Sequence, residues 1–145
     1  MEDNKSGVKV SEAMTKNPII AKPDDILPRC ARKMLSHNVG CIIIEKDKKL
    51  LGIATEKDFV EQAIGKELNT NKTKIKEIMS TGMVITTKPD AGLIEAIRIM
   101  VREDVRRLPV IKNGKLVGLL TMRDVLKIQP KFLKEFTSYI LREKK

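Results

Sequence analysis

Apolar residues recur twice in this chain with the period of a helix. Residues 27–35 and residues 93–101 each place apolar side chains at positions i, i+3, i+4, i+7 and i+8. This spacing gathers them on one face, so both segments are predicted to form amphipathic α-helices. Asp24 and Asp90 precede them and are predicted to cap their first turns. The two stripes are Leu27, Cys30, Ala31, Met34 and Leu35, and Leu93, Ala96, Ile97, Met100 and Val101.

A β-hairpin is predicted after each of these helices, because two short apolar runs follow with turn residues between them. Asn113 and Gly114 form a strong signal for a tight two-residue turn in the second hairpin. Asp47 and Lys48 stand at the same place in the first hairpin and predict a looser turn. The predicted strands are 41–44 and 50–54 in the first hairpin, and 108–111 and 116–120 in the second.

Shorter elements complete each copy of the pattern. A lead helix and a short strand are predicted in front of each amphipathic helix, and another helix is predicted directly after each hairpin. These elements are the lead helices 9–14 and 74–79, the strands 19–21 and 84–86, and the helices that open at Glu56 and Met122. Residues 1–8 are predicted to form a frayed tail, and residues 66–74 are predicted to form a polar linker. Residues 130–145 predict a C-terminal amphipathic helix, with Phe132, Leu133, Phe136, Tyr139 and Ile140 on its apolar face.

The two copies also match in sequence. From Pro23 and from Pro89 the chain aligns with itself without a gap, at an offset of 66 residues, and the lead segments align at an offset of 65. Two copies of one supersecondary unit are typical of a fold in which neither copy buries its apolar face alone. The sequence therefore predicts repeats at 9–65 and 75–129 that build one domain.

The chain is basic, with 29 Lys and Arg residues against 19 Asp and Glu and a net charge of +10. Residues 1–74 carry +3 and residues 75–145 carry +7. This surplus is compatible with an anionic partner such as nucleic acid, a nucleotide or a membrane surface, but it is more typical of an ordinary solvated surface. Aromatic residues make up only 3% and Trp is absent, so the stacking platform of a single-strand binder is missing.

The residues that usually carry catalysis are sparse. His37 is the only histidine, and no Ser/His/Asp set, carboxylate pair, metal-ligand cluster or phosphate-binding G-x-x-x-x-G-K-[ST] loop is visible. Cys30 and Cys41 lie in apolar contexts without C-x-x-C spacing and are expected to be buried free thiols. We therefore expect a protein that is not an enzyme and holds no metal. Without a signal peptide or a long apolar run, it is also expected in the cytoplasm and not in a membrane.

One motif, G-x-x-T-x-x-D, closes each hairpin, at Gly52–Asp58 and at Gly118–Asp124. Thr and Asp at this spacing resemble a capping box, which simply starts a helix. The same residues also suit a nucleotide, because a helix start and a Thr hydroxyl bind phosphate and an Asp accepts hydrogen bonds from a ribose. Both interpretations stay open. Arg106 and Arg107 enter the middle strand of the second copy, where they are suited to grip a phosphate.

The doubled pattern, with "RRLPVIKNGKLVGLLTMRD" and its weaker twin, resembles a pair of cystathionine-β-synthase (CBS) domains over residues 9–129. The resemblance implies an α/β (α+β) fold of two βαββα repeats. In this fold a pseudo-twofold relates the repeats, their sheets pack face to face, and the helices lie outside. It also implies two clefts that hold AMP, ADP, ATP or S-adenosylmethionine in relatives, and frequent association of two modules into a dimer.

The resemblance also implies which residues form the clefts, since the Thr and Asp of one repeat act with strand residues of the other. Arg106 stands where the regulatory subunit of AMP-activated protein kinase has the His of its His-Arg-x-Pro-Val pattern. The second site has no cation at the matching place, so a less charged ligand, or none, is expected there. The first site is Thr55, Asp58, Met83, Val84, Arg106, Arg107 and Pro109, and the second is Thr121, Arg123, Asp124, Pro18, Ile19, Gly40 and Cys41.

The leading hypothesis is a non-catalytic sensor that binds an adenosine-containing ligand and transmits its occupancy to a homodimer or to an effector protein. It needs no cofactor other than this regulatory ligand. One alternative is nucleic-acid binding through the basic C-terminal half, which would depend steeply on salt. Another alternative is a structural dimer scaffold with degenerate clefts.

Overall fold

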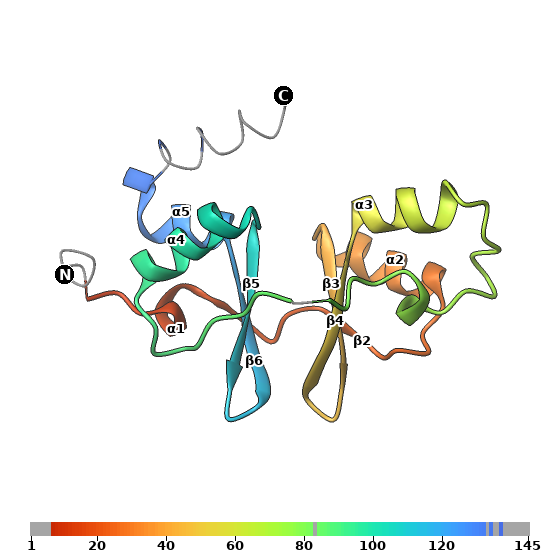
Figure 1. Ribbon diagram of the computed structural model, residues 1–145, viewed down its shortest axis with the longest axis horizontal. Coiled ribbons are helices and arrows are strands. Elements are labelled where there is room, and N and C mark those ends of the chain that lie inside the picture. The colour runs from red at the N-terminus through yellow and green to blue at the C-terminus, as the bar shows by residue number, and fades with distance from the viewer. Residues whose placement is uncertain (1–6, 83, 133, 135–136, 138–145) are drawn as a thin grey trace. The chain divides into compact units, whose positions relative to one another are not determined.

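The computed structural model describes residues 7–82, 84–132, 134 and 137. The chain divides into two compact units (Figure 1). Unit 1 joins the N-terminal residues up to Asn17 with the segment from Ile85 onward, and unit 2 runs from Pro18 to Val84. Each unit holds one three-stranded sheet with helices packed against it. This is the mixed α+β architecture that the sequence predicts.

Unit 2 is built on a sheet of order β2-β3-β4, in which β2 runs parallel to β3 and β3 antiparallel to β4. Helix α2 connects β2 to β3, and a helix follows β4 directly. The bounds are β2 (Ile20–Ala21), α2 (Leu27–His37), β3 (Cys41–Lys46), β4 (Lys49–Thr55), α3 (Glu56–Asp58), the π-helix η2 (Phe59–Ile64) and the 3-10 helix η3 (Ile75–Glu77).

Unit 1 repeats the order of helix, hairpin and helix, but its sheet has the order β1-β6-β5, in which both pairings are antiparallel. The bounds are α1 (Val10–Ala13), β1 (Thr15–Lys16), α4 (Leu93–Glu103), β5 (Arg107–Lys112), β6 (Lys115–Thr121), α5 (Met122–Ile128) and the 3-10 helix η4 (Pro130–Phe132). The predicted strand 84–86 is wrong as a strand. Only Thr87 pairs there, in a parallel bridge to Val110.

The lead segment of each sequence repeat packs in the unit of the other repeat. Thr15, which follows lead helix α1, pairs with Leu119 of β6. Ser80, which follows η3, pairs with Ile53 of β4 at the equivalent place. Compact units and sequence repeats therefore do not coincide, because each last strand pairs with a segment far away in the chain.

The glycines of the two G-x-x-T-x-x-D motifs make this pairing possible. A Cβ added to Gly118 would lie 2.6 Å from the Met14 sulfur and 3.0 Å from the Thr15 carbonyl oxygen. A Cβ added to Gly52 would lie 2.8 Å from the Met79 sulfur and 2.7 Å from the Ser80 carbonyl oxygen. The motif glycine thus serves the close approach of a lead segment in both units.

The predicted hairpins are confirmed, and each of their strands is two residues longer than expected. Both carry a bulge at the same place, between Ile44 and Glu45 and between Val110 and Ile111. The expectation of a looser first turn is wrong. Asp47 and Lys48 both adopt positive φ, as Asn113 and Gly114 do, so the first hairpin also closes with two residues.

The predicted caps at Asp24 and Asp90 are wrong. Helix α2 begins two residues later than that cap requires, and the Leu27 N–H donates to the carbonyl of Thr73. In α4 the Leu93 N–H donates to the carbonyl of Val8. Backbone carbonyls just before each lead helix accept hydrogen bonds from the first N–H groups of α2 and α4. These helices therefore need no side-chain cap.

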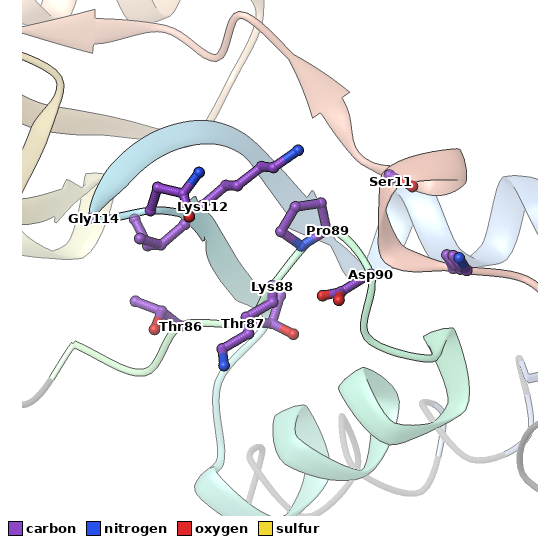
Figure 2. A pocket seen from close by; sticks show the side chains of 11 residues that line it. Ser11, Thr86, Thr87, Lys88, Pro89, Asp90, Lys112 and Gly114 are labelled. Atoms are coloured by element: carbon purple, nitrogen blue, oxygen red, sulfur yellow. The ribbon is translucent and has the colours of Figure 1, made fainter.

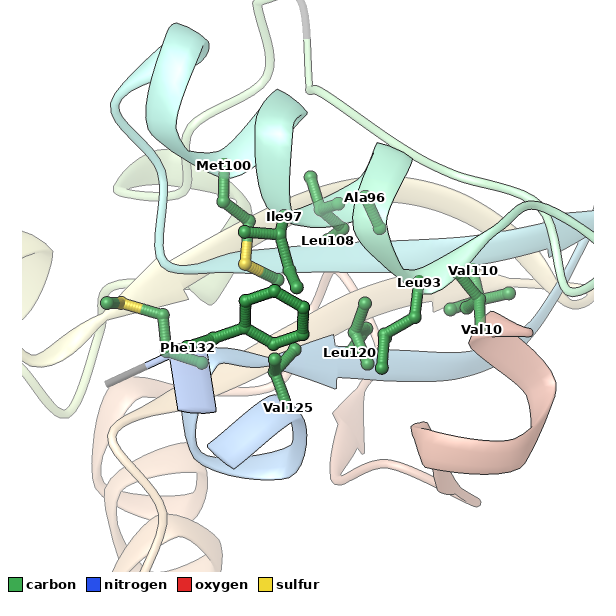
Figure 3. Packing of buried hydrophobic residues seen from close by; sticks show 11 residues of the cluster. Val10, Leu93, Ala96, Ile97, Met100, Leu108, Val110, Leu120, Val125 and Phe132 are labelled. Carbon is green, nitrogen blue, oxygen red and sulfur yellow. The ribbon is translucent and has the colours of Figure 1, made fainter. Parts of the chain in front are cut away.

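Each unit has a separate apolar core beneath its sheet. Figure 3 shows the core of unit 1, where the Phe132 ring lies between Ile97 of α4 and Val125 of α5. The two predicted helix stripes are buried, or half-buried at Ala31 and Val101, except at Leu35, which is 80% exposed and corrects the sequence-based expectation. The cores contain Val10, Leu93, Ala96, Ile97, Met100, Leu108, Val110, Leu120, Met122, Val125 and Phe132 in unit 1, and Ala21, Leu27, Cys30, Met34, Ile42, Ile44, Ala54, Ala63, Ile75 and Ile78 in unit 2.

Two predictions at the chain ends fall mostly outside the described residues. These are the frayed tail 1–8, of which only Gly7 and Val8 are described, and most of the C-terminal helix 130–145. Its first residues form η4, and Phe132 is buried. Within the described part of the chain, no helix has the length and apolar character needed to cross a membrane.

Candidate functional site

The first Thr-x-x-Asp pair, in unit 2, forms a capping box at the start of α3. The Thr55 N–H donates to Asp58 Oδ2 at 2.9 Å, and the Asp58 N–H donates to Thr55 Oγ1 at 3.3 Å. The Thr55 hydroxyl lies 3.2 Å from the same carboxylate oxygen. Asp58 Oδ1 receives no hydrogen bond from any described residue. Asp58 is only half-buried, so this oxygen remains available to a ligand.

The second pair, in unit 1, forms the same box at the start of α5 and has an additional partner. The Thr121 N–H donates to Asp124 Oδ2 at 3.0 Å, and the Asp124 N–H donates to Thr121 Oγ1 at 3.1 Å. The Thr15 hydroxyl also donates to Asp124, at 3.2 Å from both carboxylate oxygens. Both oxygens of Asp124 are therefore engaged within the protein.

Sequence reasoning missed Thr15 because it lies 109 residues from Asp124 in the chain. The available signal was that a hydroxyl residue follows the lead methionine in both copies, as Met14-Thr15 and Met79-Ser80. Only the exchange of lead segments brings one of them to a motif carboxylate.

The start of the middle strand lies beside the Thr-x-x-Asp motif in both units. In unit 1, Arg107 pairs with Thr121, and the Met122 N–H donates to the carbonyl of Arg106 at 3.0 Å. Arg106 and Arg107 thus lie at the same sheet edge as Asp124, which adds positive charge to that edge. Here Arg106 is exposed and Arg107 half-buried.

The equivalent edge of unit 2 lacks arginine. Cys41 pairs with Thr55, and the Glu56 N–H donates to the carbonyl of Gly40 at 3.1 Å. The Glu56 side chain lies close to Gly40, since a Cβ added there would be 2.9 Å from its Oε1. Unit 2 therefore presents a carboxylate where unit 1 presents two guanidinium groups.

The residues predicted for each binding site are divided between the two units. Arg106, Arg107, Pro109, Thr121, Arg123 and Asp124 belong to unit 1, and Pro18, Ile19, Gly40, Cys41, Thr55, Asp58 and Val84 belong to unit 2. Met83 lies outside the described residues. The predicted pairing of Thr55 and Asp58 with the arginines, and of Asp124 with Gly40 and Cys41, stays a prediction.

The two cysteines are buried free thiols, as the sequence predicts. Burial raises the pKa of the Cys30 thiol to about 11, and the nearby Asp25 charge acts in the same direction. Cys30 therefore stays protonated at neutral pH and is a poor nucleophile. Among the described residues, no three His, Cys, Asp or Glu side chains gather closely enough to hold a metal ion.

Comparison with known proteins identifies the family. The CBS domain family model matches residues 10–65 and again residues 75–131, which is most of the chain. The chain belongs to the CBS domain family. It carries two CBS domains in tandem, as the resemblance in sequence predicts.

Relatives and solved structures agree with this assignment. MK0525, an uncharacterised protein of Methanopyrus kandleri, is 36% identical over 126 residues, which cover 85% of this chain and 63% of that protein. The crystal structure of the CBS domain protein NE2398 has a TM-score of 0.75 at 30% identity, covering 83% of this chain and 96% of that one. The CBS domain pair of protein MJ0100, solved with 5′-methylthioadenosine and S-adenosyl-L-methionine, has a TM-score of 0.72 at 27% identity, covering 83% and 94%.

Proposed function

We propose that this CBS pair is a non-catalytic regulatory module that binds an adenosine-containing ligand and transmits its occupancy to a dimer or a partner protein. Asp58 and Asp124 would accept hydrogen bonds from the ribose. Arg106 and Arg107 would hold a phosphate, when the ligand has one. Such a ligand regulates only through its different affinities for two states of the protein.

The observation that carries this proposal is the open oxygen of Asp58. The capping box uses only the Oδ2 oxygen of Asp58. The Oδ1 oxygen can therefore accept a hydrogen bond from a ligand without disturbing the start of the helix. A half-buried carboxylate oxygen at a strand-to-helix junction is a suitable acceptor for a ribose hydroxyl. The adenosine compounds bound to the CBS pair of MJ0100 support this ligand class.

The differences between the two motifs support unequal ligand binding. Asp124 is already bonded to Thr15, so a ribose there must share or displace that hydroxyl. The site of Asp58 is therefore proposed to bind more tightly. The assignment of Arg106 and Arg107 to this site is part of the proposal and comes from the resemblance.

Exposed apolar side chains on unit 2 support assembly into a dimer. Val60 and Ile64 of η2 are 59% and 66% exposed, and Leu35 of α2 is 80% exposed. Exposed apolar surface of this kind is typical of association surfaces where the side chains are contiguous. Light scattering after size exclusion should give a dimer for the natural chain and a monomer for Val60→Lys/Ile64→Lys. A natural chain that elutes as a monomer would contradict the dimer.

The ligand class is tested by thermal unfolding at constant ionic strength with AMP, ADP, ATP, S-adenosylmethionine and a short DNA duplex. A ligand at 100 times its Kd stabilises the folded chain by about 2.7 kcal/mol, which raises Tm by several degrees. We expect such a shift with at least one adenosine compound and none with DNA. A shift confined to DNA, and lost at high salt, would overturn the sensor in favour of nucleic-acid binding.

The role of the carboxylates is tested with Asp58→Glu and Asp124→Glu. Glu is the usual acidic residue of a capping box, so both variants keep the helix start while moving the carboxylate by one methylene. We expect Asp58→Glu to keep the Tm of the free protein and to lose most of the ligand-induced shift. Equal ligand-induced shifts in Asp58→Glu and the natural chain would assign the motif to capping alone.

A further inference from the structure

A pocket of about 680 Å³ lies at the hairpin end of unit 1, away from the Thr-x-x-Asp motif. In Figure 2, Lys112 and Gly114 border it on the hairpin, and Ser11 of α1 lies beyond Pro89. Lys9 and the segment 86–90 complete the wall. The volume falls in the range of roughly 300–1,000 Å³ that is typical of small-molecule sites.

Thr87 is the residue of this pocket that a purely structural role does not explain. It is only 6% exposed, yet its hydroxyl makes no hydrogen bond to any described residue. No fully buried side-chain polar atom in the described chain lacks a partner. The Thr87 hydroxyl is therefore not completely buried, and Thr87 is one of the residues that line the pocket.

The repeat in unit 2 shows that this hydroxyl is not required by the fold. Ala21 occupies the equivalent position, pairs with Ile44 as Thr87 pairs with Val110, and is buried in the core. A methyl group thus satisfies the same backbone position. The Thr87 hydroxyl is thus an additional polar group in unit 1, on a residue that lines the pocket.

One lysine of the pocket, Lys9, differs from its counterpart in unit 2 in a comparable way. Lys9, Lys88 and Lys112 line the pocket, and none of them forms an ion pair with any residue that the structure describes. In unit 2, Lys74 and Lys76 occupy the places of Lys9 and Ser11. Asp24 accepts from both, at 3.5 Å and 3.0 Å.

The interaction favours the charged form of Asp24, because hydrogen bonding to Lys76 and the charge of Lys74 lower the pKa of its carboxyl group. Asp90, its counterpart in unit 1, has no such partner in the described chain. Lys74 and Lys76 of unit 2 are therefore neutralised by a carboxylate of their own unit, while the three ammonium groups around the unit 1 pocket have no such partner in the described chain.

The geometry points to a second binding site: we propose that this pocket binds the phosphate group of a small molecule through Lys9, Lys88, Lys112 and the Thr87 hydroxyl. Ammonium and hydroxyl donors are the groups that hold phosphate oxygens by charge-assisted hydrogen bonds. The pocket has room for an organic body beside the phosphate. The net charge of its lining is positive, since Asp90 is the one acidic residue among its three lysines.

The site is separate from the motif that carries the proposed function. Strand β5 pairs Arg107 with Thr121 at one end and Lys112 with Lys115 at the other. At about 3.3 Å per residue, these ends lie about 16 Å apart. A phosphate in the pocket is therefore held independently of Asp124, and binding there does not depend on adenosine recognition.

The test is a calorimetric titration of the full chain with pyrophosphate at constant ionic strength. Lys88→Gln/Lys112→Gln should weaken binding at least about tenfold, because each lysine removed takes a charge-assisted hydrogen bond to the phosphate with it. The matched control is Lys22→Gln/Lys46→Gln, which removes the equivalent lysines of unit 2 and the same total charge. It should leave the affinity within about twofold. Equal weakening in both pairs, or no binding by the natural chain, would overturn the site.

Thr87→Val separates a ligand contact from a structural one. Val keeps the shape and the backbone pairing, so we expect an unchanged Tm and a several-fold weaker affinity for pyrophosphate. A lower Tm with unchanged affinity would give Thr87 a structural role instead. Amide chemical shifts give the location, and we expect changes at Thr87 and Gly114. Changes confined to Thr55 and Thr121 would move the anion to the motif.

Adenosine and AMP distinguish the source of the phosphate and keep the two proposals apart. AMP that shifts the Thr87 amide, where adenosine does not, identifies a nucleotide phosphate, while pyrophosphate alone identifies a free anion. Asp58→Glu should leave pyrophosphate binding unchanged, and Lys88→Gln/Lys112→Gln should leave adenosine binding unchanged. Either proposal can therefore fail without the other.

Discussion

The two units share one framework and differ in the polar residues attached to it. Both carry the same hairpin, the same bulge and the same capping box after the last strand. In unit 1 the motif carboxylate is held by Thr15, while in unit 2 Ser80 occupies the equivalent place and makes no side-chain hydrogen bond to any described residue. The two units thus share one backbone, while the polar contacts of their motif carboxylates differ.

The opposite end of each sheet shows the reverse contrast. There unit 2 pairs Lys74 and Lys76 with Asp24, while in unit 1 three lysines without an ion pair in the described chain line a pocket together with Thr87. In each unit, the polar groups at one end of the sheet are paired within the protein, and some of those at the other end lack such a partner among the described residues. The comparison separates residues that build the CBS framework from residues that give each copy a chemistry of its own.

The largest expected effect concerns the independence of the two cores. Leu27→Ala and Leu93→Ala remove equivalent buried side chains, and each should lower the free energy of unfolding by about 2–5 kcal/mol. Hydrogen exchange should show the greater loss of protection in the unit that carries the change. Leu35→Ala, at an exposed position, should have little effect. Equal loss in both units after Leu27→Ala would contradict separate cores.

A smaller loss is expected where the lead segments cross the last strands. Gly52→Ala and Gly118→Ala force a methyl group against Met79 or Met14 and the adjoining backbone, and should each cost about 1–3 kcal/mol. Urea unfolding measures these losses in the free energy of unfolding. The control is Gly82→Ala, because an added Cβ there meets no atom within 4 Å. Similar stability losses at all three glycines would show that backbone freedom, and not close contact, is responsible.

Alkaline pH should weaken unit 2 through Cys30, whose equivalent in unit 1 is Ala96. The thiol has a pKa of about 11 in the folded chain against an ordinary value of 9.0, so the unfolded chain loses its proton first as pH rises. Stability from this group is complete below pH 9 and is lost as pH approaches 11, by about 1 kcal/mol at pH 10. Cys30→Ala should remove this part of the pH dependence. An unchanged pH profile in the variant would contradict it.

The smallest effect is expected at the contact that distinguishes the two motifs. Thr15→Val removes the hydroxyl that donates to Asp124 and should lower the free energy of unfolding by about 0.5–1 kcal/mol. Ser80→Ala, the matched change in the other copy, should have no measurable effect. Thr15→Val should also strengthen any ligand bound at Asp124, which calorimetry would detect. Equal effects of the two variants would remove the difference between the motifs.

Local pattern was sufficient to predict much of the fold. The buried face of α4, both hairpins and the helices that open at Glu56 and Met122 follow from side-chain periodicity and turn residues close in sequence. The repeat and the CBS family also follow from the sequence. The predicted tightness of the first turn failed because the strands on both sides of Asp47 and Lys48 impose positive φ on residues that do not favour it.

The remaining errors involve partners far away in the chain. The prediction of caps at Asp24 and Asp90 failed because the carbonyls of Thr73 and Val8 accept the hydrogen bonds from the helix starts. Strand 84–86 failed because only Thr87 reaches its neighbour. Sequence identified Asp58 and Asp124 as a matched pair, but it gave no sign that Thr15 holds one of them.

The sequence by itself determined the elements, their duplication and the residues at each strand-to-helix junction, because these depend on contacts within one turn or one hairpin. The tertiary structure decided which lead segment pairs with which last strand, which carboxylate oxygen is open and which lysines lack a partner. Those outcomes depend on groups brought together across as many as 109 residues of chain, as between Thr15 and Asp124. Periodicity carries no information about such contacts, whereas hydrogen-bond geometry in the folded chain shows them directly.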